Sequence, residues 1–270
     1  MNQILLVIVL YKCALKDSHS YRSLLSRYDA LSIFVYDNSP TSQDVDIPNV
    51  IYVHDPTNGG LGVAYNKAAS YAKGHGFKWL LLLDQDTLFP EDALSRYEEA
   101  IISHDDVSMI VPKHRIVDGR YISPTKTFMK TSYPCKTVKS GCVSFKEASP
   151  INSGILLTVD SFFKVGGYDP EVTLDFSDVR FVEKYKKRYD SFYVIELECL
   201  QDFSVNEKDV NKLLGRYLIF LQCAKNCKKE RWHDYIAYLG VTLKRTLRLT
   251  LQTKNLVFFK LYFKNYLLKK

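Results

Sequence analysis

Apolar residues in the first hundred positions come in short continuous runs, and the segments between them are polar or have helical spacing. Continuous apolar runs of four to eight residues are typical of strands buried on both faces. Helical spacing is clearest from residue 63 to 73, before the helix stop Gly74-His75-Gly76. Strands that alternate with helices through short loops predict an α/β fold with a right-handed, mostly parallel sheet flanked by helices. The four predicted strands are residues 4–11, 31–36, 50–53 and 79–83, and a further short helix is expected from about 18 to 27.

The pattern loosens after Pro90. Residues 112–150 are rich in Lys, Ser, Thr, Tyr and Gly without a clear period, which predicts loops or short strands. Regular spacing returns at residue 151. The expected elements are helices at 91–103 and 159–164, a surface helix at 181–190, and strands at 107–111, 151–158 and 191–197.

Polar clusters follow three of the predicted strands. Asp37, the segment from Asn58 to Gly60, and the segment from Asp84 to Asp86 each come directly after an apolar run. Ligands of open α/β sheets bind beyond the carboxyl ends of the strands. We therefore expect one crevice to contain all three clusters.

Two carboxylates, Asp84 and Asp86, end the most apolar strand. Side chains alternate along an extended segment, so both could point the same way with Gln85 turned aside. Two hard oxygen ligands suit Mg²⁺ or Mn²⁺, which take their remaining ligands from water and substrate phosphates. The alternative is a solvated turn before a helix, with Pro90 at its first position.

The segment Asn58-Gly59-Gly60-Leu61-Gly62 opens the helix at 63–73. Glycines at a helix start let backbone approach a ligand and favour an anionic group. The spacing does not match the dinucleotide fingerprint, which also follows the first strand of such folds and not the third. A loop that needs positive φ angles is the structural alternative.

A second carboxylate pair, Asp175 and Asp178, lies three residues apart. This spacing could place both on one face of a helical turn. A helix cap or a solvated edge is the alternative for such a pair.

Composition supports a folded chain. Its 270 residues are 46% hydrophobic and 13% aromatic, which excludes general disorder and allows a large core. The six cysteines contain no Cys-x-x-Cys pair and are too few for a disulfide framework, so free thiols in a reducing cytosol are expected. The apolar N-terminus lacks a basic flank and a cleavage site, and reads as a strand and not as a signal peptide. No apolar stretch reaches the roughly 18 residues needed to span a bilayer.

Charge is distributed unevenly along the chain. Residues 1–202 carry 22 Lys and Arg against 26 Asp and Glu, whereas residues 203–270 carry 15 against 4. On a helical wheel that starts at Tyr235, the apolar residues Ile236, Leu239, Leu243 and Leu247 cluster opposite Lys244, Arg245 and Arg248. This amphipathic pattern fits either packing on the rest of the chain or contact between residues 230–270 and an anionic membrane surface. No nucleic-acid-binding signature accompanies the basic charge.

Taken together and in this order, six motifs resemble glycosyltransferase family 2 enzymes of the GT-A fold, most closely the bacterial rhamnosyltransferase-like branch. The resemblance covers about residues 4–205. The motifs are Val35-Tyr36-Asp37-Asn38-Ser39, Asn58 to Asn66, Leu83-Asp84-Gln85-Asp86, Asn152-Ser153-Gly154, Val165-Gly166-Gly167-Tyr168 and Leu174-Asp175-Phe176-Ser177-Asp178.

The resemblance implies a nucleotide-sugar donor, with Asp84 and Asp86 holding Mn²⁺ or Mg²⁺ and Asp37 contacting the base. Asp178 falls at the position of the catalytic base, with Asp175 as second choice. The base would take the proton of an acceptor hydroxyl that attacks the anomeric carbon and inverts it. Further donor-binding residues are expected at Leu10, Tyr11, Asn38, Asn58, Gly59, Gly60, Ala64, Asn66 and Gln85, and residues on the acceptor or donor-sugar side at Asn152, Ser153, Gly154 and Gln201.

Three positions depart from the family pattern. The family often has Glu two residues and Arg six residues after the base, where this chain has Arg180 and Lys184. It also often has His just before the segment Asp202-Phe203-Ser204, where this chain has Gln201. Gln can coordinate a metal through its carbonyl or donate a hydrogen bond to phosphate, but less strongly than His, so the alternatives are weaker metal binding or reduced activity.

The sequence predicts a GT-A catalytic domain at residues 1–205, with a nucleotide-sugar half up to about 111 and an acceptor half from about 112, and a basic amphipathic helical region at 206–270. The expected function is an inverting, metal-dependent transfer from dTDP-rhamnose or a UDP-sugar to a glycan, possibly lipid-linked, in cell-surface polysaccharide synthesis. The expected location is the cytoplasm, possibly on the inner face of the membrane. The rivals are a sugar nucleotidyltransferase, which needs a glycine-rich loop that residues 10–14 lack, and a non-catalytic sugar-binding protein.

Overall fold

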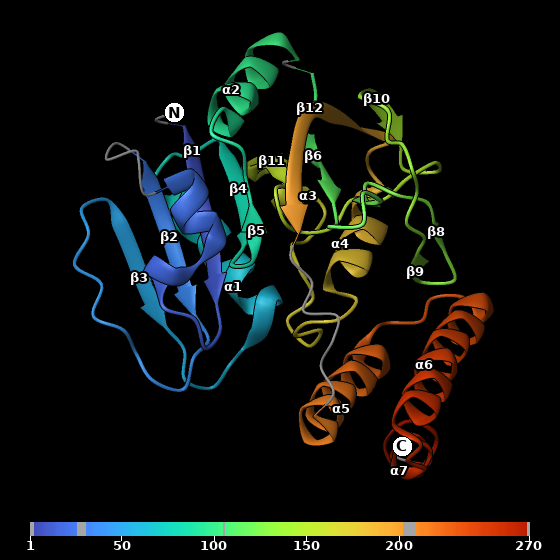
Figure 1. Cartoon of the computed structure of the whole chain (residues 1–270). Coiled ribbons are helices and arrows are strands. Elements are labelled where there is room, and N and C mark those ends of the chain that lie inside the picture. The colour runs from blue at the N-terminus through green and yellow to red at the C-terminus, as the bar shows by residue number, and fades with distance from the viewer. Residues whose placement is uncertain (1–2, 26–30, 105, 202–208, 269–270) are drawn as a thin grey trace.

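A central sheet runs through the molecule in the order β10-β12-β6-β11-β4-β1-β2-β3. The structure is a computed structural model, and it describes residues 3–25, 31–104, 106–201 and 209–268 (Figure 1). The strands on this path are β1 (Ile4–Leu10), β2 (Ser32–Asp37), β3 (Val50–His54), β4 (Trp79–Asp84), β6 (Met109–Arg115), β10 (Gly141–Ser144), β11 (Leu156–Thr158) and β12 (Ser191–Gln201). The short strands β5 (Thr87–Leu88) and β7 (Tyr121–Ser123) pair with β12 and β6, and β8 (Thr127–Phe128) and β9 (Thr131–Ser132) form a separate hairpin.

The α/β class with a helix-flanked sheet is confirmed, and most neighbouring pairs along the path of the sheet are parallel. Strands β4, β1, β2 and β3 are parallel neighbours, as are β6 and β12. The pairs β11–β4, β11–β6, β10–β12, β12–β5 and β6–β7 are antiparallel, so the sheet as a whole is mixed. The strands that add antiparallel pairs are β5, just before Pro90, and β7, β10 and β11 after it.

Side chains of the central strands point alternately to the two faces of the sheet, and each face contributes to its own hydrophobic core. On one face, residues such as Val7 and Leu82 pack against α1 (Gly60–Gly74), α3 (Val159–Lys164) and α4 (Ser177–Tyr185). On the other face, residues such as Ile8 and Leu83 pack against α2 (Ala93–Ser103) and Leu24 of the π-helix Tyr21–Leu25, which follows a 3₁₀ turn at Leu15–Asp17. A strand buried on both faces must be apolar throughout, which explains the continuous runs of the sequence.

The sequence misplaced two elements after residue 150. Of the predicted strand at 151–158, only Leu156–Thr158 forms a strand, which is β11. The residues before it, Asn152 to Gly154, form a turn. The predicted surface helix at 181–190 is wrong: α4 begins earlier, ends at Tyr185, and buries Phe181, Val182 and Tyr185 in the core.

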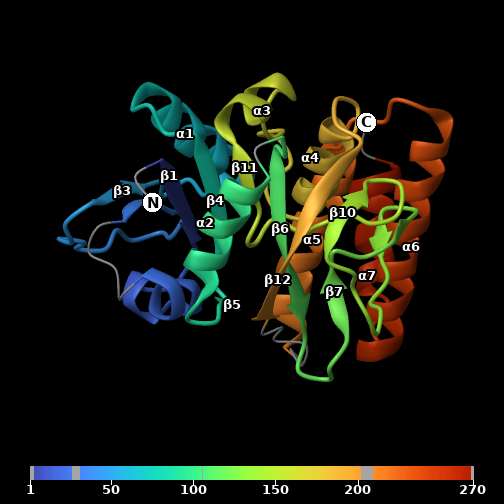
Figure 2. The same ribbon diagram turned by 90° about the horizontal axis from the view of Figure 1, so that it is seen from above.

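A third cluster joins the C-terminal helices to one loop. The helices are α5 (Val210–Asn226), α6 (Trp232–Thr253), α7 (Val257–Tyr262) and the π-helix Phe263–Leu267. Their buried residues pack with Val172 and Phe176, which precede α4. In both views these helices gather beside β10 and β12, away from β3 (Figures 1 and 2). The division at about residue 205 and the segment Asp202-Phe203-Ser204 lie outside the described residues.

The C-terminal region is helical as expected, and of the two readings of the apolar face of α6, packing on the rest of the chain is contradicted. The buried face contains Tyr238, Thr242, Thr246 and Leu249. The predicted apolar side, with Ile236, Leu239, Leu243 and Leu247, is exposed. Within the described residues, no helix combines the length and the apolar character required to cross a membrane.

Candidate active site

The carboxyl end of β4 presents the two predicted metal ligands. Asp84 ends the strand, its Oδ1 accepts a hydrogen bond from the Tyr65 hydroxyl at 3.2 Å, and its backbone N–H donates to Ser153 Oγ at 3.3 Å. Asp86 is exposed two residues later, and Gln201 Nε2 donates to its Oδ1 at 2.8 Å. The strand tip therefore holds two carboxylates whose orientations are fixed by α1 and β12.

Electrostatics make this pair suitable for a cation. Burial raises the pKa of Asp84 to about 7, and the negative charges of Asp86 and Asp178 add to the rise, while the hydrogen bond from Tyr65 opposes it. A divalent cation would relieve this repulsion and keep both carboxylates ionised. The donor set therefore fits Mg²⁺ or Mn²⁺. Among the described residues, no group of three His, Cys, Asp or Glu side chains converges as a ready-made metal site.

Gln85 turns away from the two aspartates, as expected. Its Oε1 accepts the Tyr11 backbone N–H at 2.8 Å, and its Nε2 donates to the Tyr11 carbonyl oxygen at 3.4 Å. Tyr11 itself is exposed at the end of β1, whereas Leu10 is fully buried. Gln85 thus ties the ends of β1 and β4 together, and Leu10 offers a ligand only its backbone.

Asp37 lies at the end of β2 and is fully buried. Burial acts to raise its pKa, but hydrogen bonds from Ser39, Tyr52 and Gln43 outweigh burial and lower the pKa overall. Its Oδ2 accepts from Tyr52 and from Gln43, each at 2.7 Å, and its Oδ1 accepts from the Ser39 N–H at 2.9 Å. These hydrogen bonds fix the Asp37 carboxylate against the loop that follows β2, and its contact with a nucleotide base stays a prediction.

The glycine segment is held between the loop that follows β2 and the loop that precedes α4. Asn58 and Gly60 have positive φ angles of 54° and 83°. Asn38 Oδ1 accepts the Gly60 N–H at 3.3 Å, and the Leu61 N–H donates to the Thr173 carbonyl oxygen at 2.8 Å. A Cβ at Gly60 would lie 2.4 Å from that oxygen, so only glycine fits between the two loops.

Asp55 organises the same loop and was missed by the sequence analysis. Its carboxylate accepts the backbone N–H groups of Thr57 and Gly59 at 3.0 and 3.1 Å. Hydrogen bonds from Thr57 and from Tyr36 help to lower its pKa to about 2. A lone Asp before a Pro-Thr pair carries no distinctive sequence signal.

Two residues expected to bind the donor belong to the fold instead. Ala64 is fully buried on α1, in the core. Asn66 donates to the Tyr168 carbonyl oxygen at 3.0 Å, and its Oδ1 accepts the Tyr168 N–H at 2.9 Å. Asn66 therefore joins α1 to the Gly166-Gly167 turn, since a buried side-chain amide needs backbone partners.

The turn Asn152-Ser153-Gly154 also lies behind the crevice and not on the acceptor side. Asn152 is buried, donates to Ser177 Oγ at 3.2 Å and accepts from the Tyr168 hydroxyl at 2.7 Å. Gly154 adopts a φ of 74° and accepts from the Tyr97 hydroxyl at 2.7 Å through its carbonyl oxygen. The turn supports β4 and α4 from behind.

Gln201 holds Asp86 instead of offering its carbonyl to a metal. Its Oε1 accepts from the Thr87 hydroxyl at 2.6 Å, and Thr87 Oγ1 lies 2.7 Å from Ser153 Oγ. A carboxylate only accepts hydrogen bonds, so the amide nitrogen must face Asp86. Sequence reasoning missed Thr87 and Tyr65, which read there as ordinary strand and helix residues.

Asp178 lies in the first turn of α4. Burial and the charge of Asp175 raise its pKa to about 6, against the opposing effect of the Val179 N–H, which donates to Asp178 Oδ1 at 2.7 Å. The charge of Asp178 in turn raises the pKa of Asp84. The structure thus brings Asp178 within electrostatic reach of Asp84.

The second-choice base, Asp175, is engaged in ion pairs with the C-terminal helices. It forms ion pairs with Arg216 of α5 and with Arg245 of α6, the latter at 3.3 Å. Both arginines hold the carboxylate against the C-terminal helices, so Asp175 is a structural anchor and Asp178 is the stronger candidate for a base. The departures at 180 and 184 are structural too, since Arg180 pairs with Glu183 at 2.8 Å and Lys184 donates to the Gly166 carbonyl oxygen at 2.8 Å.

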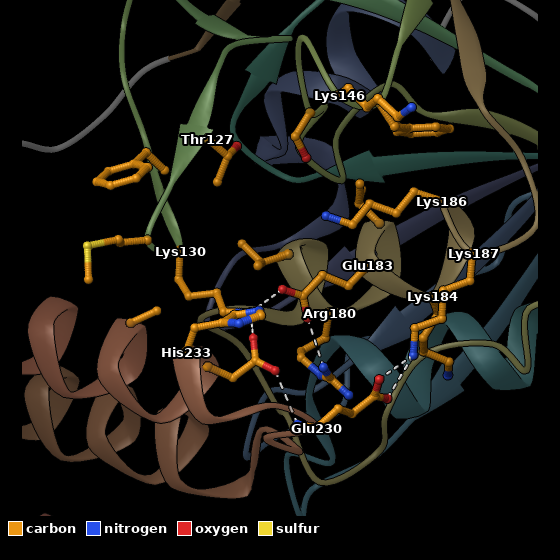
Figure 3. Close-up of a pocket in the computed structure, with 18 of the residues that line it drawn as sticks. Thr127, Lys130, Lys146, Arg180, Glu183, Lys184, Lys186, Lys187, Glu230 and His233 are labelled. Carbon is orange, nitrogen blue, oxygen red and sulfur yellow. Dashed lines mark hydrogen bonds and ion pairs between the residues drawn. The ribbon is translucent and has the colours of Figure 1, made fainter.

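A separate cavity of about 960 Å³ opens beside α4. The hairpin β8–β9, the segment 145–149, α4 and the start of α6 surround it (Figure 3). One side of the cavity is lined by a network of ion pairs, in which Lys130 pairs with Glu183 and Asp234, and Arg180 also pairs with Glu183. Lys146 and Lys186 extend along the other side. Val179, next to Asp178, lines the cavity.

The fold is of the GT-A type. Residues 7–162 match the family profile described as Glycosyl transferase family 2, and the chain belongs to that family. A search of curated proteins finds no match. The family assignment makes the protein a glycosyltransferase, and the rhamnosyltransferase-like branch stays a prediction.

Solved structures share the fold at low sequence identity. S. aureus TarS 1-349 is 14% identical with a TM-score of 0.52, and the match covers 91% of this chain and 72% of TarS 1-349. The same protein in complex with UDP-GlcNAc is 13% identical over 91% of this chain and 73% of that one, also with a TM-score of 0.52. GalNAc-T7 with UDP, GalNAc and Mn²⁺ is 14% identical with a TM-score of 0.53, over 74% of this chain and 44% of that one.

Proposed function

We propose that the protein transfers a sugar, with inversion, from a nucleoside-diphosphate sugar to a hydroxyl group of a glycan. The observation that carries this proposal is the arrangement of three carboxyl groups, with Asp84 and Asp86 at the tip of β4 and Asp178 within electrostatic reach from α4. Family membership supports the reaction class.

Asp84 and Asp86 are the proposed ligands of Mn²⁺ or Mg²⁺. When bound there, the ion neutralises charge on the donor diphosphate and on the departing nucleoside diphosphate. The donor is proposed to be a UDP-sugar or dTDP-rhamnose. Solved structures of similar fold contain UDP-GlcNAc, or UDP with Mn²⁺, which supports a uridine diphosphate donor. Backbone of the glycine segment at the start of α1 is available to the phosphates.

Asp178 is the proposed base. Its carboxylate would accept the proton of the acceptor hydroxyl as that oxygen bonds to the anomeric carbon, while the bond from that carbon to the diphosphate oxygen breaks on the opposite face. One base suffices for this single displacement. The raised pKa of Asp178 makes it a better proton acceptor than a solvated aspartate.

The proposed acceptor is a glycan, lipid-linked, in the synthesis of a cell-surface polysaccharide at the cytoplasmic face of the membrane. The cavity beside α4 is the proposed site for its outer sugars, because Val179 lines that cavity next to Asp178.

The proposal is tested by isothermal titration of UDP and dTDP with and without Mn²⁺. We expect nucleoside diphosphate binding that strengthens at least about tenfold with Mn²⁺ and loses this gain in Asp86→Ala. Metal-independent binding that is unchanged in Asp86→Ala would contradict it. The cavity is tested separately, since Lys186→Glu should raise the KM for a glycan acceptor and leave UDP binding unchanged.

A further inference from the structure

Within the part of the chain that the structure describes, helix α6 is covered on two sides. On one side, Thr242 and Thr246 face Tyr262 and Tyr217 of the neighbouring helices, with Tyr217 Oη 2.5 Å from Thr246 Oγ1. On another side it meets the hairpin β8–β9 and the segment that follows. There Lys130 pairs with Asp234 at 2.9 Å, and Lys244 lies over the ring of Tyr133.

The third side of α6 is apolar and open to solvent. It carries a row of large side chains at helical spacing, and the first of them, Trp232, is 74% exposed. We call this row the α6 stripe. The α6 stripe consists of Trp232, Ile236, Leu239, Leu243 and Leu247, all of them exposed. Single exposed apolar residues are normal on a protein surface, but a continuous row over four helical turns indicates a binding surface.

Charge along the α6 stripe is predominantly positive. Residues 235–270 contain eight Lys and Arg and no Asp or Glu, and the acidic residue in the first turn of α6, Asp234, is paired with Lys130. Lys244 and Arg248 are exposed on α6, and Lys260 and Lys264 are exposed beyond it. A second copy of the chain would bring the same positive charge against itself, whereas an anionic phospholipid surface is complementary to it.

We propose that the α6 stripe is a membrane-docking surface that inserts its apolar side chains among the head groups of anionic phospholipids. An apolar helix face with basic residues at its edge lies in the plane of a lipid interface, and an aromatic residue such as Trp232 suits the head-group level. The proposed membrane docking rests on the proposed function in one respect, since a lipid-linked acceptor gives the enzyme a reason to bind a membrane.

The docking helix is connected to the proposed base. Arg245, on the buried side of α6, pairs with Asp175 at 3.3 Å, and Asp175 lies three residues before Asp178. Phe176 of the same loop packs on Phe220 of α5 and Tyr238 of α6. One side of α6 would contact lipid while another contacts the loop that carries Asp175 and Phe176. Membrane docking would therefore hold Asp178 at a fixed distance from the membrane surface.

The protein contains an intrinsic reporter of this contact. Trp79 is buried in β4, and Trp232 is the other tryptophan of the chain. The whole chain, without donor, metal or acceptor, is mixed with vesicles of phosphatidylcholine alone or with 30% phosphatidylglycerol. We expect sedimentation with the anionic vesicles, a blue shift of tryptophan emission, and quenching by brominated lipid that is absent in Trp232→Phe.

Matched variants separate apolar from electrostatic contributions. Leu239→Ser/Leu243→Ser should reduce vesicle affinity at least about tenfold. Its control is Ile102→Ser/Val117→Ser, two residues that are each 82% exposed on other surfaces. Lys244→Gln/Arg248→Gln should reduce affinity about 25-fold, since each charge near an anionic surface contributes about fivefold. Its control is Lys78→Gln/Lys164→Gln, which removes two exposed charges elsewhere.

Three results would overturn the proposal. The first is no binding of the wild-type chain to anionic vesicles, and the second is undiminished binding of Leu239→Ser/Leu243→Ser. The third is self-association in sedimentation equilibrium without lipid that this variant abolishes, which would make a second copy the occupant. None of these measurements involves turnover, so failure of docking and failure of the proposed reaction are distinguishable.

Discussion

The side-chain amide nitrogen of Gln201 lies 2.8 Å from Oδ1 of Asp86, although 115 residues separate them in the chain. Because Gln201 ends β12 and is buried, it fixes the more exposed of the two proposed metal ligands from behind. Its own Oε1 is occupied by the Thr87 hydroxyl. Gln201 is therefore a positioning residue for Asp86.

Replacement of Gln201 by Leu keeps the volume and removes the hydrogen bond to Asp86. We expect the dissociation constant for Mn²⁺, measured by calorimetry in the presence of UDP, to rise about 10- to 100-fold, as is usual when a ligand loses the group that orients it. Gln222→Leu is the control, because Gln222 also donates to a side chain, Asn226, but lies exposed on α5. Equal Mn²⁺ affinity in the two variants would contradict this role.

Asp178 and Asp175 should respond differently to the same change. In Asp178→Asn we expect kcat to fall about 10²- to 10⁴-fold, because the proton acceptor is lost, with donor affinity changed less than about twofold. In Asp175→Asn we expect the free energy of unfolding to fall by about 1–2 kcal/mol, since Arg216 and Arg245 lose a partly exposed partner. Turnover assays and urea denaturation on both variants measure this. A larger loss of kcat in Asp175→Asn than in Asp178→Asn would reverse the assignment.

Gly60 should tolerate no side chain. A Cβ there would lie 2.4 Å from the Thr173 carbonyl oxygen, at a φ of 83° that L-residues rarely adopt. We expect Gly60→Ala to lower the free energy of unfolding in urea by about 2 kcal/mol or more and to weaken UDP binding. Gly74→Ala, at the other end of the same helix, meets nothing within 4 Å, and should be neutral or stabilising by up to about 1 kcal/mol. Similar effects at both positions would show that the contact with Thr173 is unimportant.

The sequence predicted the first four strands and α1 because each is a local pattern with one interpretation. It also predicted that the ends of β1, β2, β3 and β4 would meet, because parallel strands share an edge. It could not decide whether the apolar face of α6 is buried or exposed. That helix buries Thr242 and Thr246, whose hydroxyls donate to the backbone carbonyls of Tyr238 and Thr242 one turn earlier. A hydropathy wheel does not identify such residues as buried, so it left open which face packs on the rest of the chain.

The sequence predicted the carboxylates of the site, but it did not predict the residues that hold them in position. Asp84 and Asp86 follow an apolar run, and this local arrangement is informative. Asn66, by contrast, resembles a ligand residue in sequence, yet its partner Tyr168 lies 102 residues away. Side-chain amides and hydroxyls serve equally well for ligands and for distant backbone, so only the packed structure separates the two uses.

Stability should depend on pH through His114, which supports the turn behind the site. His114 is fully buried, its Nε2 lies 2.8 Å from the Ser153 carbonyl oxygen, and its Nδ1 has no hydrogen-bond partner among the residues that the structure describes. Burial lowers the pKa of His114 to about 4, although the bond to Ser153 opposes the change. An unfolded histidine keeps a pKa near 6.5, so below that pH the unfolded chain takes up a proton that the folded chain refuses.

The stabilising contribution of neutral His114 is therefore complete above about pH 6.5 and declines as the pH falls towards 4. Linkage predicts a loss of about 2 kcal/mol at pH 5 relative to pH 7.5. Urea denaturation at both values measures the loss. His114→Gln, which can still donate to Ser153, should remove about this much of the pH dependence, whereas His75→Gln, at an exposed histidine, should leave the dependence intact. An unchanged pH dependence in His114→Gln would show that another group carries it.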